Sequence, residues 1–256
     1  MKSRKELLNI LEQNIKVVVL AAGKGTRLNA GDGNAPKVMR EACGKPLLGH
    51  VLDALSFVGE KDIIIVVGYE KEQITSRFPG FIFAEQTEQL GTGHAVMAAA
   101  DELRGFSGTV LVCYGDMPAI RRETYLAFID EHLRRTNDCT ILTGESSIPL
   151  PYGRIVRDPD GAFLGVVEDR DCSPTERSIT ELNSGVYLFS APMLLGALGE
   201  LRNDNVQGEY YLTDVPGIIR RNGGKVGTHR RDLGDEIIGV NTLQQLELVG
   251  KILSKK

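Results

Sequence analysis

The sequence predicts an α/β fold with a mostly parallel central sheet flanked by helices. Three short apolar runs rich in β-branched residues indicate buried parallel strands, at Val17–Leu20, Ile63–Val67 and Val110–Tyr114. Two segments with helical spacing of their apolar residues lie between them, at about Leu47–Val58 and Thr92–Leu103. Strands that alternate with helices are typical of βαβ units on a parallel sheet.

The first predicted strand runs into a loop of small residues, and cations follow. The relevant positions are Leu20, Ala21, Ala22, Gly23, Lys24, Gly25, Arg27 and Lys37. Because Ala and Gly side chains are small, backbone N–H groups of such a loop approach a ligand closely. Open α/β sheets bind ligands at the carboxyl ends of their strands. Three cations beside exposed N–H groups therefore predict a polyphosphate site. The alternative is an ordinary βα turn, which does not need these cations.

Two familiar glycine motifs do not fit this loop. Walker A requires G-x-x-x-x-G-K-[ST], whereas the chain reads Gly23-Lys24-Gly25-Thr26. The dinucleotide fingerprint requires a glycine where Leu28 stands, so its close contact between helix and strand is lost. A nicotinamide-dependent dehydrogenase is therefore disfavoured.

The second half of the sequence has a different texture. A helix at about Thr124–Arg135 and a strand at Cys139–Leu142 extend the sheet. Short strands and turns then predict a small β-rich subregion beside the nucleotide-binding half, at Arg154–Arg157, Phe163–Val167 and Gly185–Phe189. The remaining segments have helical patterns, at about Pro192–Leu201, Tyr211–Arg221 and Thr242–Leu253.

Length and composition indicate one globular domain of 256 residues. We expect two halves, at about 1–145 and about 146–241, followed by a C-terminal helix at 242–256. The net charge of −4 disfavours nucleic-acid binding. No apolar run approaches the roughly 18–20 residues that span a bilayer. The four cysteines lack C-x-x-C spacing, which disfavours zinc, and a cytoplasmic location is expected.

Three downstream positions carry chemistry suited to a nucleotide and a metal ion. The Gln86 amide offers a donor and an acceptor to a base, and the helix predicted near Thr92 has N–H groups at its start. Asp116 follows a buried strand, where its carboxylate would lie beside phosphates and hold Mg²⁺; the alternative is a turn-forming role. The Asn241 amide oxygen is a suitable hard ligand, but this residue is also a candidate N-cap.

These segments together resemble the sugar-nucleotide pyrophosphorylases. The resemblance is strongest to the uridyltransferase domain of bifunctional bacterial N-acetylglucosamine-1-phosphate uridyltransferases. It rests on L-A-A-G-x-G-T-R-L from Leu20, Pro36-Lys37, Q-x-x-Q-L-G-T-G-H-A from Gln86, Gly115-Asp116-Met117-Pro118 and Gly239-Val240-Asn241. It implies a nucleotide-diphospho-sugar transferase fold, with a Rossmann-like, mostly parallel sheet and a small β-rich sugar-binding subregion. In such a fold the half at about 1–145 would bind the nucleotide, and the half at about 146–241 would bind the sugar and the metal.

The resemblance also implies a role for each matching residue. Catalysis falls to Arg27 and Lys37, and metal binding to Asp116 and Asn241. The nucleotide would be bound by Leu20, Ala21, Ala22, Gly23, Lys24, Gly25, Gln86, Gly91 and Thr92. The sugar would be bound by Tyr114, Gly153, Glu168, Asn183 and Tyr211.

The implied reaction makes UDP-N-acetylglucosamine and pyrophosphate from UTP and N-acetylglucosamine 1-phosphate with Mg²⁺. The resembled enzymes continue into an acetyltransferase of hexapeptide repeats that this sequence lacks, so acetyl-CoA is not an expected partner. Neither a nucleic acid nor a membrane is expected as a partner. Two alternatives remain open: a transferase of the same fold with another base or sugar, and a non-catalytic sensor of sugar nucleotides.

Overall fold

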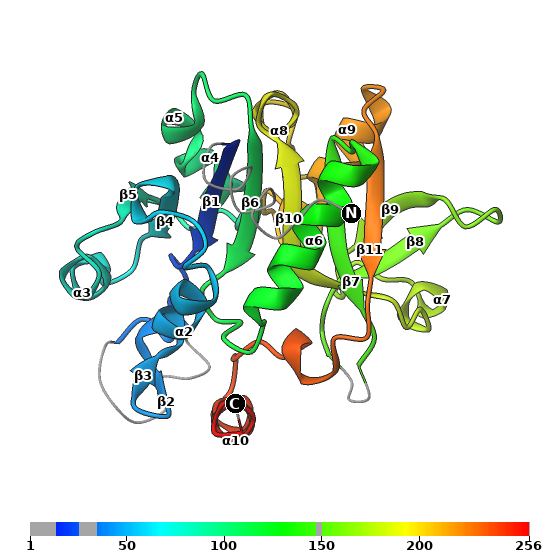
Figure 1. Ribbon diagram of the computed structural model, residues 1–256. Helices are drawn as coiled ribbons and strands as arrows, with labels where there is room; N and C mark the ends of the chain where they lie inside the picture. Colours follow the sequence, from blue (N-terminus) through cyan, green and yellow to red (C-terminus); the bar gives the residue numbers. More distant parts are fainter. Residues whose placement is uncertain (1–13, 26–34, 147–149, 256) are drawn as a thin grey trace.

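A nine-stranded sheet runs through the molecule in the order β11-β7-β10-β6-β1-β4-β5, as the computed structural model shows (Figure 1). The structure describes residues 14–25, 35–146 and 150–255. The strands of this path are β1 (Ile15–Leu20), β4 (Ile63–Val67), β5 (Ile82–Glu85), β6 (Thr109–Tyr114), β7 (Cys139–Gly144), β10 (Leu182–Ser190) and β11 (Val226–Arg230). The last two, β8 (Arg154–Arg157) and β9 (Phe163–Val167), branch from β10.

Four of the six strand pairings along this path are parallel, which confirms the predicted α/β class with a mostly parallel central sheet. Strand β1 pairs in parallel with β4 and β6, and β7 pairs in parallel with β11. Val17, Val18 and Val19 are fully buried, because helices cover both faces. Val17 and Val19 pack into the core that includes α2 (Leu47–Ala54) and α6 (Arg122–Arg135). Val18 packs into the opposite core, with α4 (Thr92–Ala98), α8 (Ala191–Leu198) and α9 (Val215–Arg221).

The strand predicted at Gly185–Phe189 does not belong to a separate β-rich subregion. As β10, it lies inside the main sheet, antiparallel to both β6 and β7. It is buried on both faces for most of its length, as a parallel strand would be. An apolar run therefore identified the strand but not its neighbours. The antiparallel hairpin of β8 and β9 does extend to one side, as expected.

Several other elements differ from the sequence-based expectation. The predicted helix Thr92–Leu103 breaks at Ala99 into α4 and α5 (Ala100–Leu103), although its apolar residues keep helical spacing across the break. The prediction missed β5, β11 and the short helices α3 (Lys71–Arg77) and α7 (Pro174–Arg177). Strand β11 reads Val-Gly-Thr-His-Arg and has no fully buried residue. Its sequence therefore contains no apolar run from which a strand could be predicted.

None of the described helices combines the length and apolar character needed to cross a bilayer.

A partly buried ion pair connects the β8–β9 hairpin to the main sheet. Arg157 of β8 donates to both carboxylate oxygens of Glu181, over 2.7 and 2.8 Å. Thr143 of β7 donates to the same carboxylate, over 2.7 Å. Burial opposes ionisation of Glu181, but these donors hold its pKa below the usual value. The hairpin, which ends just before Glu168, is thereby held against β7 and β10.

Candidate active site

Two adjoining cavities open at the carboxyl ends of β1 and β6, of about 260 and 230 Å³. The first, which we call the nucleotide cavity, is lined by residues that include Ala21, Ala22, Gln86 and Thr92. The second, the acceptor cavity, is lined by residues that include Gly153, Glu168 and Asn183. Lys37, Tyr114 and Asp116 line both cavities. The sequence motifs for base, sugar and metal therefore meet at one edge of the sheet, where α/β folds bind ligands.

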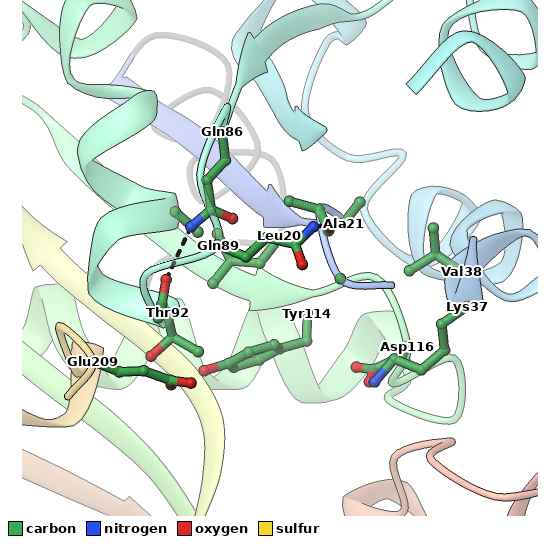
Figure 2. A pocket seen from close by; sticks show the side chains of 14 residues that line it. Leu20, Ala21, Lys37, Val38, Gln86, Gln89, Thr92, Tyr114, Asp116 and Glu209 are labelled. Atoms are coloured by element: carbon green, nitrogen blue, oxygen red, sulfur yellow. Dashed lines mark hydrogen bonds and ion pairs between the residues drawn. The ribbon is translucent and has the colours of Figure 1, made fainter. Parts of the chain in front are cut away.

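Gln86 lies in the nucleotide cavity with its amide nitrogen already bonded. It is only 5% exposed, and its Nε2 donates to the Gly91 carbonyl over 3.1 Å and lies 3.2 Å from His94 Nδ1. Figure 2 shows the amide oxygen on the opposite side from this nitrogen. The oxygen is thus the atom of this amide that could accept a hydrogen bond from a ligand in the cavity.

The start of α4 is less open than the sequence suggested. Gly93 N–H donates to the Tyr210 carbonyl over 2.7 Å, and Tyr210 N–H donates to the Leu90 carbonyl over 2.8 Å. Gly91 has a φ of +107°, and a Cβ there would lie 2.6 Å from the Tyr210 oxygen. Only glycine fits this position. The expectation that the N–H groups at the start of this helix face a ligand was wrong for Gly93, because the Tyr210 carbonyl already accepts from its N–H.

Tyr114 separates the two cavities. Its ring lies between Thr92 and Asp116, and its hydroxyl points toward Thr92 and Glu209 (Figure 2). Gly185 has a φ of +80°, and a Cβ there would lie 2.6 Å from the ring. Burial raises the pKa of the Tyr114 phenol, and the nearby Glu168 and Asp116 carboxylates raise it further. Tyr114 therefore stays neutral at physiological pH.

The Lys37 ammonium lies between the two predicted metal ligands. It forms an ion pair with Asp116 Oδ2 and donates to Asn241 Oδ1 over 3.0 Å (Figure 2 shows Lys37 and Asp116). Gly25 supports this arrangement, since its φ is +63° and a Cβ there would lie 2.5 Å from Lys37 Cβ. Asp116 and Asn241 follow Lys37 in the sequence by 79 and 204 positions, and both side chains converge on its ammonium group.

Asn241 is not the N-cap of the last helix, α10 (Leu243–Leu253). Thr242 takes that position, with a capping box in which its side chain accepts from Gln245 N–H. The Asn241 N–H donates to Gln245 Oε1 over 2.8 Å. The Asn241 side chain is therefore left to face Lys37 and Asp116 across the acceptor cavity.

Three of the residues predicted to bind sugar, Gly153, Glu168 and Asn183, form one wall of the acceptor cavity. Asn183 N–H donates to the Gly153 carbonyl over 2.9 Å, and Asn183 Nδ2 donates to Tyr187 Oη over 2.6 Å. Glu168 accepts from Thr213 Oγ1 over 2.9 Å. Burial and the nearby carboxylates of Asp171, Asp214 and Asp169 raise the pKa of Glu168, and the Thr213 bond only partly offsets this. This wall offers hydrogen-bonding groups of fixed geometry, as hydroxyl-rich ligands require.

Not every predicted site residue lines a cavity. Arg27 lies outside the described residues. Lys24, Gly25 and Tyr211 do not belong to either lining among the described residues. Tyr211 is buried, and its hydroxyl accepts from Gln207 Nε2 over 2.8 Å. Its predicted sugar contact stays a prediction.

The linings also contain residues that the sequence analysis did not select. Gln89 lines the nucleotide cavity and donates to the Ala22 carbonyl over 2.9 Å. Glu209 lines the same cavity, and Tyr152 lines the acceptor cavity. Gln89 stands inside the motif that begins at Gln86. Tyr152 and Glu209 stand one and two positions before the selected residues Gly153 and Tyr211, so closeness to these segments was the available signal.

The donor set at Lys37 fits a hard divalent cation. Asp116 contributes a carboxylate oxygen and Asn241 an amide oxygen, and both already face one positive charge. Oxygen donors of this kind suit Mg²⁺, which commonly takes one or two protein ligands and completes its shell with phosphates and water. Within the described parts of the chain, no group of three or more His, Cys, Asp and Glu side chains gathers as a metal site.

Comparison with known proteins places the chain in a family. A model of the MobA-like NTP transferase domain matches residues 17–210. The bifunctional protein GlmU of Lactococcus lactis (strain IL1403) is 44% identical over 90% of this chain and 51% of its own length. GlmU of Clostridioides difficile (strain 630) is 39% identical over 95% of this chain and 52% of its own length. The chain thus spans about half the length of these curated relatives.

Solved structures share the fold at low sequence identity. A candidate glucose-1-phosphate thymidylyltransferase of Bacillus anthracis, solved with a sucrose, aligns with a TM-score of 0.72 at 18% identity, over 93% of this chain and 94% of its own. HddC of Yersinia pseudotuberculosis, solved with GMP-PN, gives 0.67 at 22% identity, over 94% of this chain and all of its own. The fold, the convergent motif residues and the matched domain agree with the resemblance read from the sequence. The chain therefore belongs to the MobA-like NTP transferase family of nucleotidyltransferases.

Proposed function

We propose that this chain transfers a uridylyl group from UTP to N-acetylglucosamine 1-phosphate, which gives UDP-N-acetylglucosamine and pyrophosphate. The observation that carries the proposal is the position of Lys37, Asp116 and Asn241 where the nucleotide and acceptor cavities meet. A base beside Gln86 and a sugar beside Asn183 would bring their phosphates together at that point. The resemblance to N-acetylglucosamine-1-phosphate uridyltransferases, together with the 44% and 39% identity to two GlmU proteins, supports the choice of substrates.

In the proposed mechanism the sugar phosphate oxygen attacks the α-phosphorus of UTP, and pyrophosphate leaves. The nucleophile needs no general base, because a phosphate monoester has a second pKa near ~6 and is largely ionised at neutral pH. The obstacle is the repulsion between two polyanions. Lys37 and Arg27 would offset that charge and stabilise the leaving pyrophosphate, while the Gly23 loop and Lys24 hold the triphosphate.

Mg²⁺, when bound by Asp116 and Asn241, would supply the further positive charge that such a reaction needs. The side chains on either side would keep the reactants aligned. Gln86 and Thr92 would orient the nucleotide, and Glu168, Asn183 and Tyr114 would orient the sugar. Two cationic groups and a metal site exceed what a sensor of sugar nucleotides requires, so we favour the transferase over that alternative.

A matrix of nucleoside triphosphates and sugar 1-phosphates tests this assignment. We expect pyrophosphate release from UTP only when N-acetylglucosamine 1-phosphate or a close hexosamine analogue and a divalent cation are present. The physical reason is that the transfer needs an acceptor phosphate oxygen as nucleophile and a cation to offset the charge of the two phosphates. Greater turnover with CTP, dTTP or GTP would contradict the role of Gln86, and another preferred sugar would contradict that of Asn183. Binding of UDP-N-acetylglucosamine without turnover of any pair would favour the sensor.

A further inference from the structure

We propose that Tyr152 is a positioning residue that connects the sugar-binding wall to the metal ligand Asn241. Tyr152 immediately precedes Gly153 and lines the acceptor cavity. The Gly239 N–H, two residues before Asn241, donates to the Tyr152 hydroxyl over 2.8 Å. The hydroxyl therefore reaches across 87 positions of sequence to the backbone that presents Asn241. This inference rests on the proposed metal-dependent transfer, since it concerns one ligand of that metal.

The loop that carries Asn241 has few other connections to the site. Val240 N–H donates to the Asp116 carbonyl over 2.9 Å, which aligns the two metal-ligand segments. On the other side of the loop, Gln245 holds the Asn241 N–H from within α10. Gly239 lies between this loop and the 3-10 turn at Gly234–Ile237, and its N–H donates to the Tyr152 hydroxyl.

The fit of Gly239 against the hydroxyl is close. A Cβ at Gly239 would lie 2.9 Å from the Tyr152 oxygen, whereas the next neighbour, Met117 Cγ, would be an ordinary 3.5 Å away. A side chain at position 239 would thus push specifically on Tyr152. Because Asn241 is only two residues further on, a shift of this backbone moves its amide oxygen relative to Asp116.

Tyr152→Phe tests the connection with little change of shape. We expect the Gly239 amide to exchange its hydrogen about two- to tenfold faster, as loss of one neutral hydrogen bond implies. The Mg²⁺ concentration for half-maximal rate should rise by the same factor. The kcat at saturating Mg²⁺ and the KM for the sugar 1-phosphate should stay at the wild-type values.

Gly239→Ala provides a second route to the same contact. Alone, it should raise the Mg²⁺ requirement more than Tyr152→Phe does, because its methyl group forces the loop away from the hydroxyl. In the Tyr152→Phe background, Gly239→Ala should raise the Mg²⁺ requirement by a smaller factor, because the hydroxyl oxygen that the new methyl group would meet is gone. Substitutions at neighbouring sites that act through one contact are not additive. Tyr125→Phe is the matched control, because Tyr125 is a buried tyrosine of α6 that lines neither cavity. It should change neither the exchange of the Gly239 amide nor the Mg²⁺ requirement.

Two results would overturn the proposal. The first is unchanged Gly239 exchange and unchanged Mg²⁺ requirement in Tyr152→Phe. The second is a raised KM for the sugar 1-phosphate with a normal Mg²⁺ requirement, which would make Tyr152 a direct sugar contact. Hydrogen exchange needs no substrate, so it reports on the tether even if the substrates proposed above are wrong. The rate measurements use whichever substrate pair the matrix identifies.

Discussion

Asp116→Asn is expected to lower turnover by about 100-fold or more at millimolar Mg²⁺, since the bound cation contributes several kcal/mol of charge stabilisation. Of the two proposed protein ligands, Asp116 is the anionic one and Asn241 is neutral. Asparagine has nearly the same size, so the change removes charge and leaves the shape. Activity should partly return at high Mg²⁺ or with Mn²⁺. The measurement is a titration of the initial rate with each metal.

The fold of Asp116→Asn should survive, because the substituted amide oxygen still accepts from the Lys37 ammonium. The ion pair itself is lost, and the side chains of Lys37 and Asp116 are 17% and 12% exposed. We expect a loss of about 1 kcal/mol, which for a chain of this length lowers Tm by about 2–4 °C. Asp53→Asn is the matched control, because Asp53 forms an ion pair with Lys45 outside both cavities. A mutant that keeps its rate at low Mg²⁺ would return Asp116 to the role of a turn residue.

Lys37→Met is expected to have opposite effects on catalysis and on metal binding. Turnover should fall by roughly 10- to 150-fold, because a charge-assisted hydrogen bond of about 1.5–3 kcal/mol to the phosphates is lost. The protein without substrates should nevertheless bind Mn²⁺ about threefold or more tightly. The reason is that the Lys37 ammonium occupies the position between the Asp116 and Asn241 oxygens, and a cation must displace it and bear its repulsion.

Steady-state rates and Mn²⁺ binding followed by electron paramagnetic resonance measure the two effects separately. Lys37→Arg keeps the charge and should keep the weaker Mn²⁺ binding, while its longer fork disturbs catalysis. Lys45→Met removes a lysine from an exposed ion pair and should leave both quantities unchanged. Weaker Mn²⁺ binding in Lys37→Met would show that the lysine supports the metal site rather than competes for it.

The sequence by itself determined the fold class and the edge of the sheet at which the candidate site lies. Runs such as Val17–Leu20 and Val110–Tyr114 are buried on both faces, and only a strand between two helical layers buries such a run. The glycine loops and the polar residues at the ends of these strands then mark the carboxyl edge of the sheet. Local pattern was sufficient here because burial and backbone freedom depend on a few neighbouring residues. Half-exposed β5 and β11 gave no such pattern and were missed.

The tertiary structure alone decided which of these residues meet. An apolar run does not encode its partners, so the antiparallel place of β10 between β6 and β7 follows only from the complete sheet. The same is true of Lys37 between Asp116 and Asn241, and of Tyr152 against Gly239. Position 241 shows the difference most clearly, because its local sequence allows an N-cap. Thr242 is the N-cap, and its side chain accepts from the Gln245 N–H. The Asn241 side chain instead accepts from the ammonium of Lys37, which belongs to a distant segment. Contacts of this kind depend on how remote segments pack, and that information is not contained in the spacing of nearby residues.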